Sequence, residues 1–283
     1  MTDIPHVVIL GGGFGGLATA NEIRNSLSSS QVKITIIDKK DWFMVGFAKL
    51  WIINGTRTFE NSIGHLNQLE KKEINFMQDE ILSIDLQNKN VKTKQENISY
   101  DFLVISLGAV LAPQKIPGLM ENGFNLYDHN QLSEIHNKLQ NIDSGKIAIS
   151  IMGMPYKCPP APFEASLLID SMLRKRGVRD SVQIDFYSPA PITLPAAGPE
   201  VSKEILDLTR KTGIKEALGL DENDKIILNS TYGHHRSTYQ SFLSLSITDL
   251  YYCFQVLHFI ISENIDIVQE QYKSLVQFKH FNI

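Results

Sequence analysis

Five glycines near the start of the chain have a spacing that lets a backbone turn approach a phosphate group. The segment Gly11–Gly16 lies between a short β-branched run, residues 6–10, and a helix-like stretch, residues 17–24. This order of strand, glycine turn and helix is the fingerprint of dinucleotide-binding folds. The other interpretation is a glycine-rich turn that only links a strand to a helix, but the surrounding elements favour the fingerprint.

Individual residues of this turn have separate expected roles. Gly11 permits the tight turn, Gly13 lets the backbone approach a pyrophosphate, and Gly16 lets the helix pack closely on the strand. Phe14 and Gly15 complete the turn. The free N–H groups and the positive dipole end of the following helix should then bind the phosphates.

An acidic residue ends the second strand-like run. Asp38 follows residues 32–37 and lies about 22 residues beyond Gly16, near the place where the fingerprint has an acid that binds ribose hydroxyls. A carboxylate there repels a 2′-phosphate, so it favours FAD or NAD over NADP. Lys39, next in the chain, and Gly108, in a later turn, are the other residues that we assign to the cofactor site.

A second strand-turn-helix unit follows, but its turn is rich in proline. Residues 146–152 and 182–187 are the expected strands, and residues 163–175 the expected helix. The turn between them, Gly153–Pro162, has no G-x-G-x-x-G pattern, and prolines and Lys157 stand where glycines would have to admit a pyrophosphate. NADH should therefore not bind at this turn.

The repeated units predict an α/β fold with two Rossmann-like dinucleotide-binding (FAD/NAD(P)-binding) domains, of which the second and the C-terminal part are incomplete. We expect an FAD-binding domain at residues 1–112, a second α/β domain at 113–214 and a divergent tail at 215–283. Within the first domain, a small hairpin is expected at residues 81–93, and the apolar run 102–105 is expected to form a buried strand.

Composition excludes several classes of protein. Of the 283 residues, 43% are hydrophobic and 20% charged, which is typical of a globular protein of about two domains. A net charge of −4 leaves no basic stripe for nucleic acid. No apolar run is long enough to span a membrane, so any membrane contact should be peripheral. The first apolar run has no basic stretch ahead of it, which predicts a cytoplasmic protein without a signal peptide.

Three segments resemble the two-dinucleotide-fold flavoproteins, and within them the sulfide:quinone oxidoreductase and flavocytochrome c sulfide dehydrogenase group. They are residues 11–16 with Asp38, residues 100–109, and residues 157–164, with the sequence KCPPAPFE. The third segment is the specific one. The resemblance covers roughly residues 5–214 and implies that the cofactor is FAD.

The resemblance also implies two catalytic residues. In that group the cysteine at the position of Cys158 lies beside the flavin, where it transfers sulfur or forms a covalent bond to the cofactor, and an acid like Glu164 lies close by. The resemblance implies that Cys158 is a sulfur-handling nucleophile and Glu164 a candidate proton acceptor. The nearby helix N-terminus and Lys157 favour the thiolate form of this cysteine. The alternatives are an inert buried cysteine and a glutamate that only complements the helix dipole.

The C-terminal part departs from this group. Its members use a second FAD-binding segment that ends in a Gly-Asp pair, and the sequence has no such segment. The adjacent His234 and His235 have no third ligand at a metal-binding spacing, so no metal is expected. The apolar run Leu250–Ile261, which contains Cys253, is expected to be a core segment or an interfacial one.

These observations leave three functions open. The first is an FAD-dependent oxidoreductase, similar to sulfide:quinone oxidoreductase, that moves electrons from a reduced sulfur species to a quinone or another acceptor. The second is a flavoenzyme similar to type II NADH dehydrogenase, which the proline-filled turn disfavours. The third is a non-catalytic remnant that retains dinucleotide binding, which the missing Gly-Asp segment favours.

Overall fold

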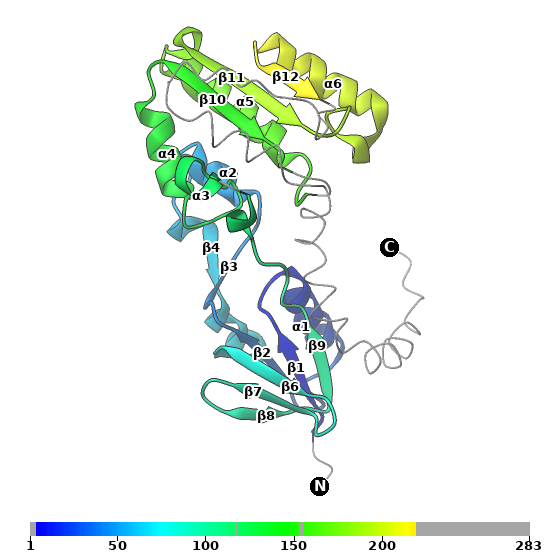
Figure 1. Ribbon diagram of the computed structural model, residues 1–283. Coiled ribbons are helices and arrows are strands. Elements are labelled where there is room, and N and C mark those ends of the chain that lie inside the picture. The colour runs from blue at the N-terminus through cyan, green and yellow to red at the C-terminus, as the bar shows by residue number, and fades with distance from the viewer. Residues whose placement is uncertain (1–3, 117, 153–155, 219–283) are drawn as a thin grey trace. The chain divides into compact units, whose positions relative to one another are not determined.

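The computed structural model describes residues 4–116, 118–152 and 156–218 (Figure 1). The paired histidines, Cys253 and the apolar run 250–261 lie outside these residues. The described chain divides into two compact units. One holds the residues up to Ala48 together with Arg57–Val110, and the other holds Lys49–Thr56 and the residues from Leu111 onward. The predicted domain limits at residues 112 and 214 stay predictions.

A four-stranded parallel sheet forms the centre of the first unit. Its strands, in the order β5-β2-β1-β9, are Asn75–Gln78, Lys33–Asp38, His6–Leu10 and Phe102–Ile105. Because the strands are parallel, the carboxyl ends of β1, β2 and β9 meet at one edge of the sheet. The glycine turn, Asp38 and the segment after Ile105 therefore start from the same edge.

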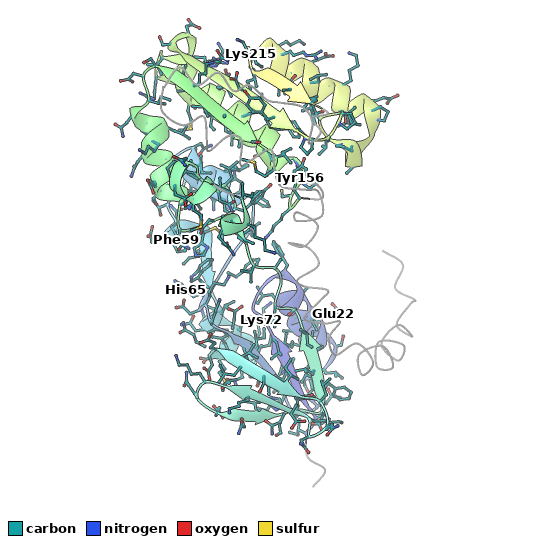
Figure 2. All side chains as sticks on the ribbon, viewed as in Figure 1. Glu22, Phe59, His65, Lys72, Tyr156 and Lys215 are labelled. Carbon is teal, nitrogen blue, oxygen red and sulfur yellow. The ribbon has the colours of Figure 1, made fainter. Side chains whose placement is uncertain are left out.

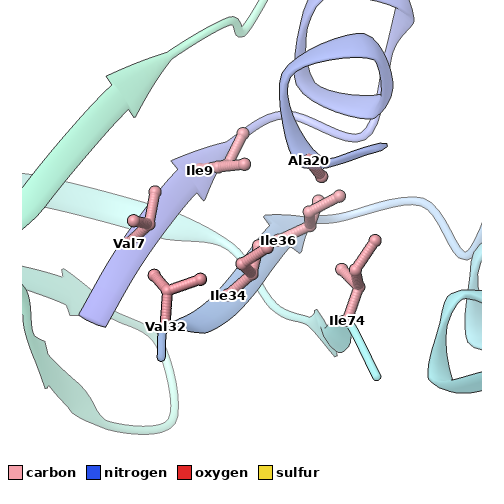
Figure 3. Close-up of a cluster of buried hydrophobic side chains, with 7 residues drawn as sticks. All are labelled: Val7, Ile9, Ala20, Val32, Ile34, Ile36 and Ile74. Atoms are coloured by element: carbon pink, nitrogen blue, oxygen red, sulfur yellow. The ribbon is translucent and has the colours of Figure 1, made fainter. Parts of the chain in front are cut away.

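One face of this sheet is covered by α1 (Phe14–Ser26), which Figure 3 shows above β1 and β2. The small side chain of Ala20 is fully buried and lets the helix approach the β-branched residues of both strands closely. The buried cluster consists of Val7, Ile9, Ala20, Val32, Ile34, Ile36 and Ile74 (Figure 3).

The opposite face of the sheet packs against an antiparallel meander of β6 (Ile81–Asp85), β7 (Asn90–Thr93) and β8 (Asn97–Ser99). A second cluster fills this interface, with Val8, Leu10, Ile37, Val91, Ile98 and Tyr100. Strands β1 and β2 are thus buried on both faces, which explains their continuous apolar sequences. The predicted hairpin is confirmed as β6 and β7, and β8 is an additional strand.

The strand predicted at residues 102–105 is confirmed as β9, but the expectation that it is buried is wrong at both ends. Phe102 is 61% exposed and Ile105 is 60% exposed. The reason is position, because β9 lies at the edge of the sheet and, among the described strands, pairs only with β1. An apolar run alone does not distinguish a central strand from an edge strand.

The second unit contains a three-stranded parallel sheet in the order β10-β11-β12, formed by Gly145–Ser150, Val182–Ser188 and Lys215–Leu218. Alternate residues of β11 are buried. On this side Phe186 stacks on Phe163 of α5 (Ala161–Lys175), with ring centroids 4.4 Å apart. The predicted second strand-turn-helix-strand unit is therefore present.

Ion pairs and short elements complete the two units. Asp170 of α5 is buried and pairs with Arg174 at 2.8 Å and with Arg179 at 2.5 Å.

The remaining helices are α2 (Ala48–Ile53), α3 (Leu119–Asn122), α4 (Leu132–Asn141) and α6 (Gly198–Lys211), and β3 (Trp42–Met44) pairs with β4 (Ile63–His65). Short 3₁₀ helices lie at Glu60–Ser62, Leu66–Lys72, Pro113–Lys115, Arg179–Ser181 and Pro195–Ala197.

The predicted α/β class, with parallel sheets of the Rossmann type, is confirmed. In the described ranges, no helix combines the length and the apolar character that crossing a bilayer requires.

Candidate functional site

The glycine turn after β1 is held by hydrogen bonds from both neighbouring strands. The Gly11 N–H donates to the carbonyl of Ile37 in β2 at 2.8 Å. On the other side, the Ser106 hydroxyl lies 2.9 Å from the carbonyl oxygen of Leu10 and 3.2 Å from that of Gly11. The Ser106 N–H also donates to Leu10 at 2.8 Å. The peptide that begins the turn is therefore fixed by β2 and by the residue that follows β9.

Two of the glycines are required by close backbone contacts. Gly11 has φ +103°, and a Cβ there would lie 2.4 Å from the carbonyl oxygen of Ser106. A Cβ on Gly16 would lie 1.9 Å from the carbonyl oxygen of Gly11. Any side chain at either position would push α1 or β9 away from the turn.

Gly13 is different, because a Cβ there would meet no atom within 4 Å. The turn is thus open at this residue, which leaves room for a group to reach the backbone. Gly13 is also the N-cap of α1, and no side chain caps the helix and no acid lies in its first turn. Free N–H groups and an unopposed positive dipole end suit a pyrophosphate. This part of the site fits the phosphates of a dinucleotide.

Phe14 and Gly15, the remaining residues of the turn, are both exposed. The ring of Phe14 is 65% exposed and contacts Phe43 edge to face, with centroids 4.8 Å apart. The Phe14 side chain therefore contributes little to the packing of the unit, and the cofactor role predicted for both residues stays a prediction.

The carboxylate of Asp38 is oriented toward the glycine turn. Its Oδ2 accepts a hydrogen bond from the Gly12 N–H at 2.8 Å, and its Oδ1 accepts one from the Lys40 N–H at 2.9 Å. A carboxylate has about four acceptor positions, so these two bonds orient the group and leave acceptor positions for ribose hydroxyls. The side chain of Lys39 is exposed, and its carbonyl accepts a bond from Gln78 at 3.2 Å.

Gly108 follows β9 at the same edge of the sheet. Its φ is +72°, in the left-handed region that favours glycine, and a Cβ there would meet no atom within 4 Å. The predicted cofactor residues of the first unit are therefore placed around one sheet edge, at the ends of β1, β2 and β9. Sequence reasoning did not select Ser106, since the motif that contains Gly11 lies about 95 residues away.

Cys158 and Glu164 belong to the second unit, at the start of α5. Cys158 is exposed and has φ +53°, and its carbonyl accepts a hydrogen bond from the Ala161 N–H at 3.0 Å. The exposed Glu164 lies in the first turn of α5, where its N–H donates to Pro160 at 3.0 Å. The inert buried alternative for Cys158 thus loses its premise, because the thiol is accessible. The catalytic roles of both residues stay predictions.

Two tyrosines line the surroundings of Cys158. The hydroxyl of Tyr156, labelled in Figure 2, donates to the Pro159 carbonyl at 3.0 Å. The buried hydroxyl of Tyr127 has no hydrogen-bond partner in the described part of the chain. Burial first, and then the neighbouring Cys158 thiol, raises the pKa of both phenols. Both groups therefore remain protonated donors at neutral pH. No motif in the sequence pointed to them.

The described residues of the two units suggest no metal site. Across residues 4–116, 118–152 and 156–218, no three side chains of His, Cys, Asp or Glu gather where they could hold an ion.

Comparisons with known proteins agree with this geometry. The sequence profile of the pyridine nucleotide-disulphide oxidoreductase family matches residues 5–150, just over half of the chain. The sulfide-quinone reductase of Aquifex aeolicus (strain VF5) is 32% identical over 189 residues, which are 66% of this chain and 43% of that protein. The type II NADH:quinone oxidoreductase of Staphylococcus aureus (strain NCTC 8325) is 26% identical over 228 residues, 75% of this chain and 56% of that protein.

A solved structure of a similar protein has the same fold as this chain. The X-ray structure of the sulfide:quinone oxidoreductase from Aquifex aeolicus superposes with a TM-score of 0.69 and 31% identity, over 76% of this chain and 51% of that one. The chain spans about half the length of the curated relatives that it matches. The matched family and these relatives agree with the predicted cofactor, FAD. The chain belongs to the pyridine nucleotide-disulphide oxidoreductase family.

Proposed function

We propose that the chain is an FAD-dependent oxidoreductase that binds the ADP half of FAD at the glycine turn. The backbone is open at Gly13, and the N-terminus of α1 has no capping side chain or acid in its first turn. Asp38 keeps acceptor positions for the adenosine ribose, while its bonds to the backbone fix its direction. FAD, when bound, supplies a two-electron carrier between a donor and an acceptor.

We further propose that the donor is a reduced sulfur species and the acceptor a quinone. The observation that carries this proposal is the exposed Cys158 in the segment KCPPAPFE, together with the likeness to the Aquifex aeolicus enzyme. Hydrosulfide that loses two electrons and its proton leaves a sulfur atom at oxidation state zero. The Cys158 thiolate would hold this atom as a persulfide, and Glu164 would accept the proton. The two electrons and two protons, one of them from solvent, convert the quinone to a quinol.

The test is reduction of the reconstituted flavin by candidate donors. The full chain is titrated with FAD, and anaerobic sulfide and NADH are compared by loss of the flavin absorbance. Sulfide should reduce the flavin and NADH should not, because the turn that ends at Pro162 lacks the glycines that a second pyrophosphate needs.

Cys158→Ser should abolish sulfide-dependent turnover or release a covalently held flavin, while Cys253→Ser serves as the matched loss of a thiol. Intact mass measured beside the visible spectrum shows whether flavin is attached covalently. Normal sulfide turnover of Cys158→Ser would contradict the assigned role of this cysteine.

A second candidate function is favoured by the 26% identity to the type II NADH:quinone oxidoreductase of Staphylococcus aureus. Rapid bleaching of the flavin by NADH would select this function over the sulfur-dependent one. If the protein takes up no flavin, and Cys158 and Cys253 are alkylated at the same slow rate, the non-catalytic remnant is selected instead.

We also propose a cytoplasmic protein that contacts the inner face of a membrane peripherally, because a quinone acceptor is dissolved in the bilayer. Membrane fractions should release the chain on washing with salt or carbonate without detergent. A requirement for detergent would contradict this location.

A further inference from the structure

The hydroxyl of Ser106 is the contact through which β9 reaches the glycine turn. Its Oγ lies within hydrogen-bond distance of two successive carbonyl oxygens, those of Leu10 and Gly11. Leu10 already receives the Ser106 N–H at 2.8 Å. The hydroxyl, on the residue that follows β9, is therefore the group that reaches the Gly11 carbonyl.

This carbonyl also faces the first turn of α1. It faces Gly16 so closely that a Cβ on Gly16 would lie 1.9 Å from the oxygen, and that same Cβ would lie 3.0 Å from the Ser106 Oγ. A Cβ on Gly15 would lie 3.2 Å from the Cβ of Ser106. Ser106 thus contacts the start of the turn and the first turn of α1 at once.

We infer that Ser106 is a positioning residue for pyrophosphate binding, which it serves by holding the Gly11 carbonyl and, through it, the N–H groups at the start of α1. This inference rests on the proposed binding of a dinucleotide at the glycine turn. Ser106 contacts the carbonyl oxygen of the Gly11–Gly12 peptide group, whose N–H donates to Asp38, while the preceding peptide group donates its N–H to Ile37. Without the hydroxyl, the Gly11–Gly12 peptide group keeps its bond to Asp38 but loses the contact on its carbonyl side.

The inference separates two parts of the ligand. The adenosine ribose depends on Asp38, whose carboxylate is oriented by the N–H groups of Gly12 and Lys40. The phosphates depend on the N–H groups that follow Gly13. Loss of the Ser106 hydroxyl should therefore weaken binding of ADP more than binding of adenosine.

The test uses the full chain, with ADP, adenosine and FAD as the ligands and isothermal titration as the measurement. Ser106→Ala should weaken ADP binding about 5- to 30-fold, as expected for one lost hydrogen bond to a buried carbonyl, and leave adenosine binding within about twofold of the unsubstituted protein. Ser106→Thr keeps the hydroxyl and should restore most of the ADP affinity. Ser83→Ala, the same change at an exposed serine of β6, is the matched control.

Three results would overturn the inference: equal ADP affinity for Ser106→Ala and the unsubstituted protein, equal losses for ADP and adenosine, or no recovery in Ser106→Thr. If the alanine variant does not fold, Ser106→Cys, which keeps the shape but donates weakly, replaces it in the same comparison. Binding of ADP without binding of FAD would contradict the proposed function alone, since the ADP arm still decides the role of Ser106.

Discussion

Gly13 and Gly16 are three residues apart in one turn, and alanine at each should separate cofactor binding from folding. At Gly16 the new Cβ would lie 1.9 Å from the backbone oxygen of Gly11, which cannot move aside like a flexible side chain. Overpacking costs about 1–3 kcal/mol, and this contact belongs at the upper end. With a urea m-value of about 2 kcal/mol/M, a loss of 3 kcal/mol lowers the midpoint by roughly 1.5 M.

Gly13→Ala should have the opposite profile. Its backbone has φ −86° and ψ −164°, an extended conformation that alanine adopts, and the new Cβ would meet no atom within 4 Å. Alanine lowers the entropy of the unfolded chain, which stabilises the folded variant, but it is a poorer N-cap than glycine, which destabilises it. Because the two effects nearly cancel, the free energy of unfolding should change by less than about 0.5 kcal/mol. The methyl group occupies the open approach to the backbone, so FAD affinity should fall by at least about tenfold, or 1.4 kcal/mol.

The assay pairs urea unfolding, followed by far-UV circular dichroism, with FAD titration for both variants. Normal FAD affinity in Gly13→Ala would refute the assignment of the open turn to the pyrophosphate. A stable Gly16→Ala would show that the helix can shift without cost and would refute the packing argument.

Three further changes test other parts of the two units. Asp38→Ala should weaken FAD binding about 10- to 100-fold through lost ribose hydrogen bonds, measured by flavin titration, and unchanged affinity would exclude this acid from the site. Asp170→Asn leaves the partly buried Arg179 without its counter-charge and should cost about 3 kcal/mol of unfolding free energy in urea, whereas a loss below about 1 kcal/mol would contradict that role. Burial lowers the pKa of His6 below 6.5, so the folded state binds fewer protons than the unfolded state, and stability should fall as the pH drops below 6.5. His6→Gln should flatten this pH dependence of stability in urea melts from about pH 7 to pH 5. An unchanged slope would exclude His6 as the source of the dependence.

Much of the first unit could be predicted because its elements carry strong local signals. The run His6–Leu10 is rich in β-branched residues and ends at glycine, and the helix begins where the fingerprint requires it. The hairpin of β6 and β7 was equally visible from its short loop. The exposure of Phe102 was not, because burial of a strand depends on which strand lies beside it, and no strand of the described chain pairs with the outer edge of β9.

The candidate site divides in the same way. Gly11, Gly13 and Gly16 belong to one short motif, so their spacing alone predicts the turn. Ser106 lies in the segment 100–109 that carries the family resemblance, but its contact with the glycine turn depends on the parallel pairing of β9 with β1. Tyr127 reaches its place by burial and leaves no local pattern in the sequence. Residues that act through a distant partner are therefore found only once the fold places them.

The geometry of Asp38 and Ser106 leads to one more consequence. Asp38 accepts from the Gly12 N–H, and Ser106 donates to the Gly11 carbonyl. These two groups belong to one peptide unit, so the two side chains hold its two sides, and residues that share a partner in this way do not act additively. The double variant Asp38→Ala with Ser106→Ala should lose less ADP affinity than the sum of the two single losses, because the first change already frees the turn that the second would loosen. Strict additivity in a double-mutant cycle would show that the carboxylate binds ribose without helping to order the turn.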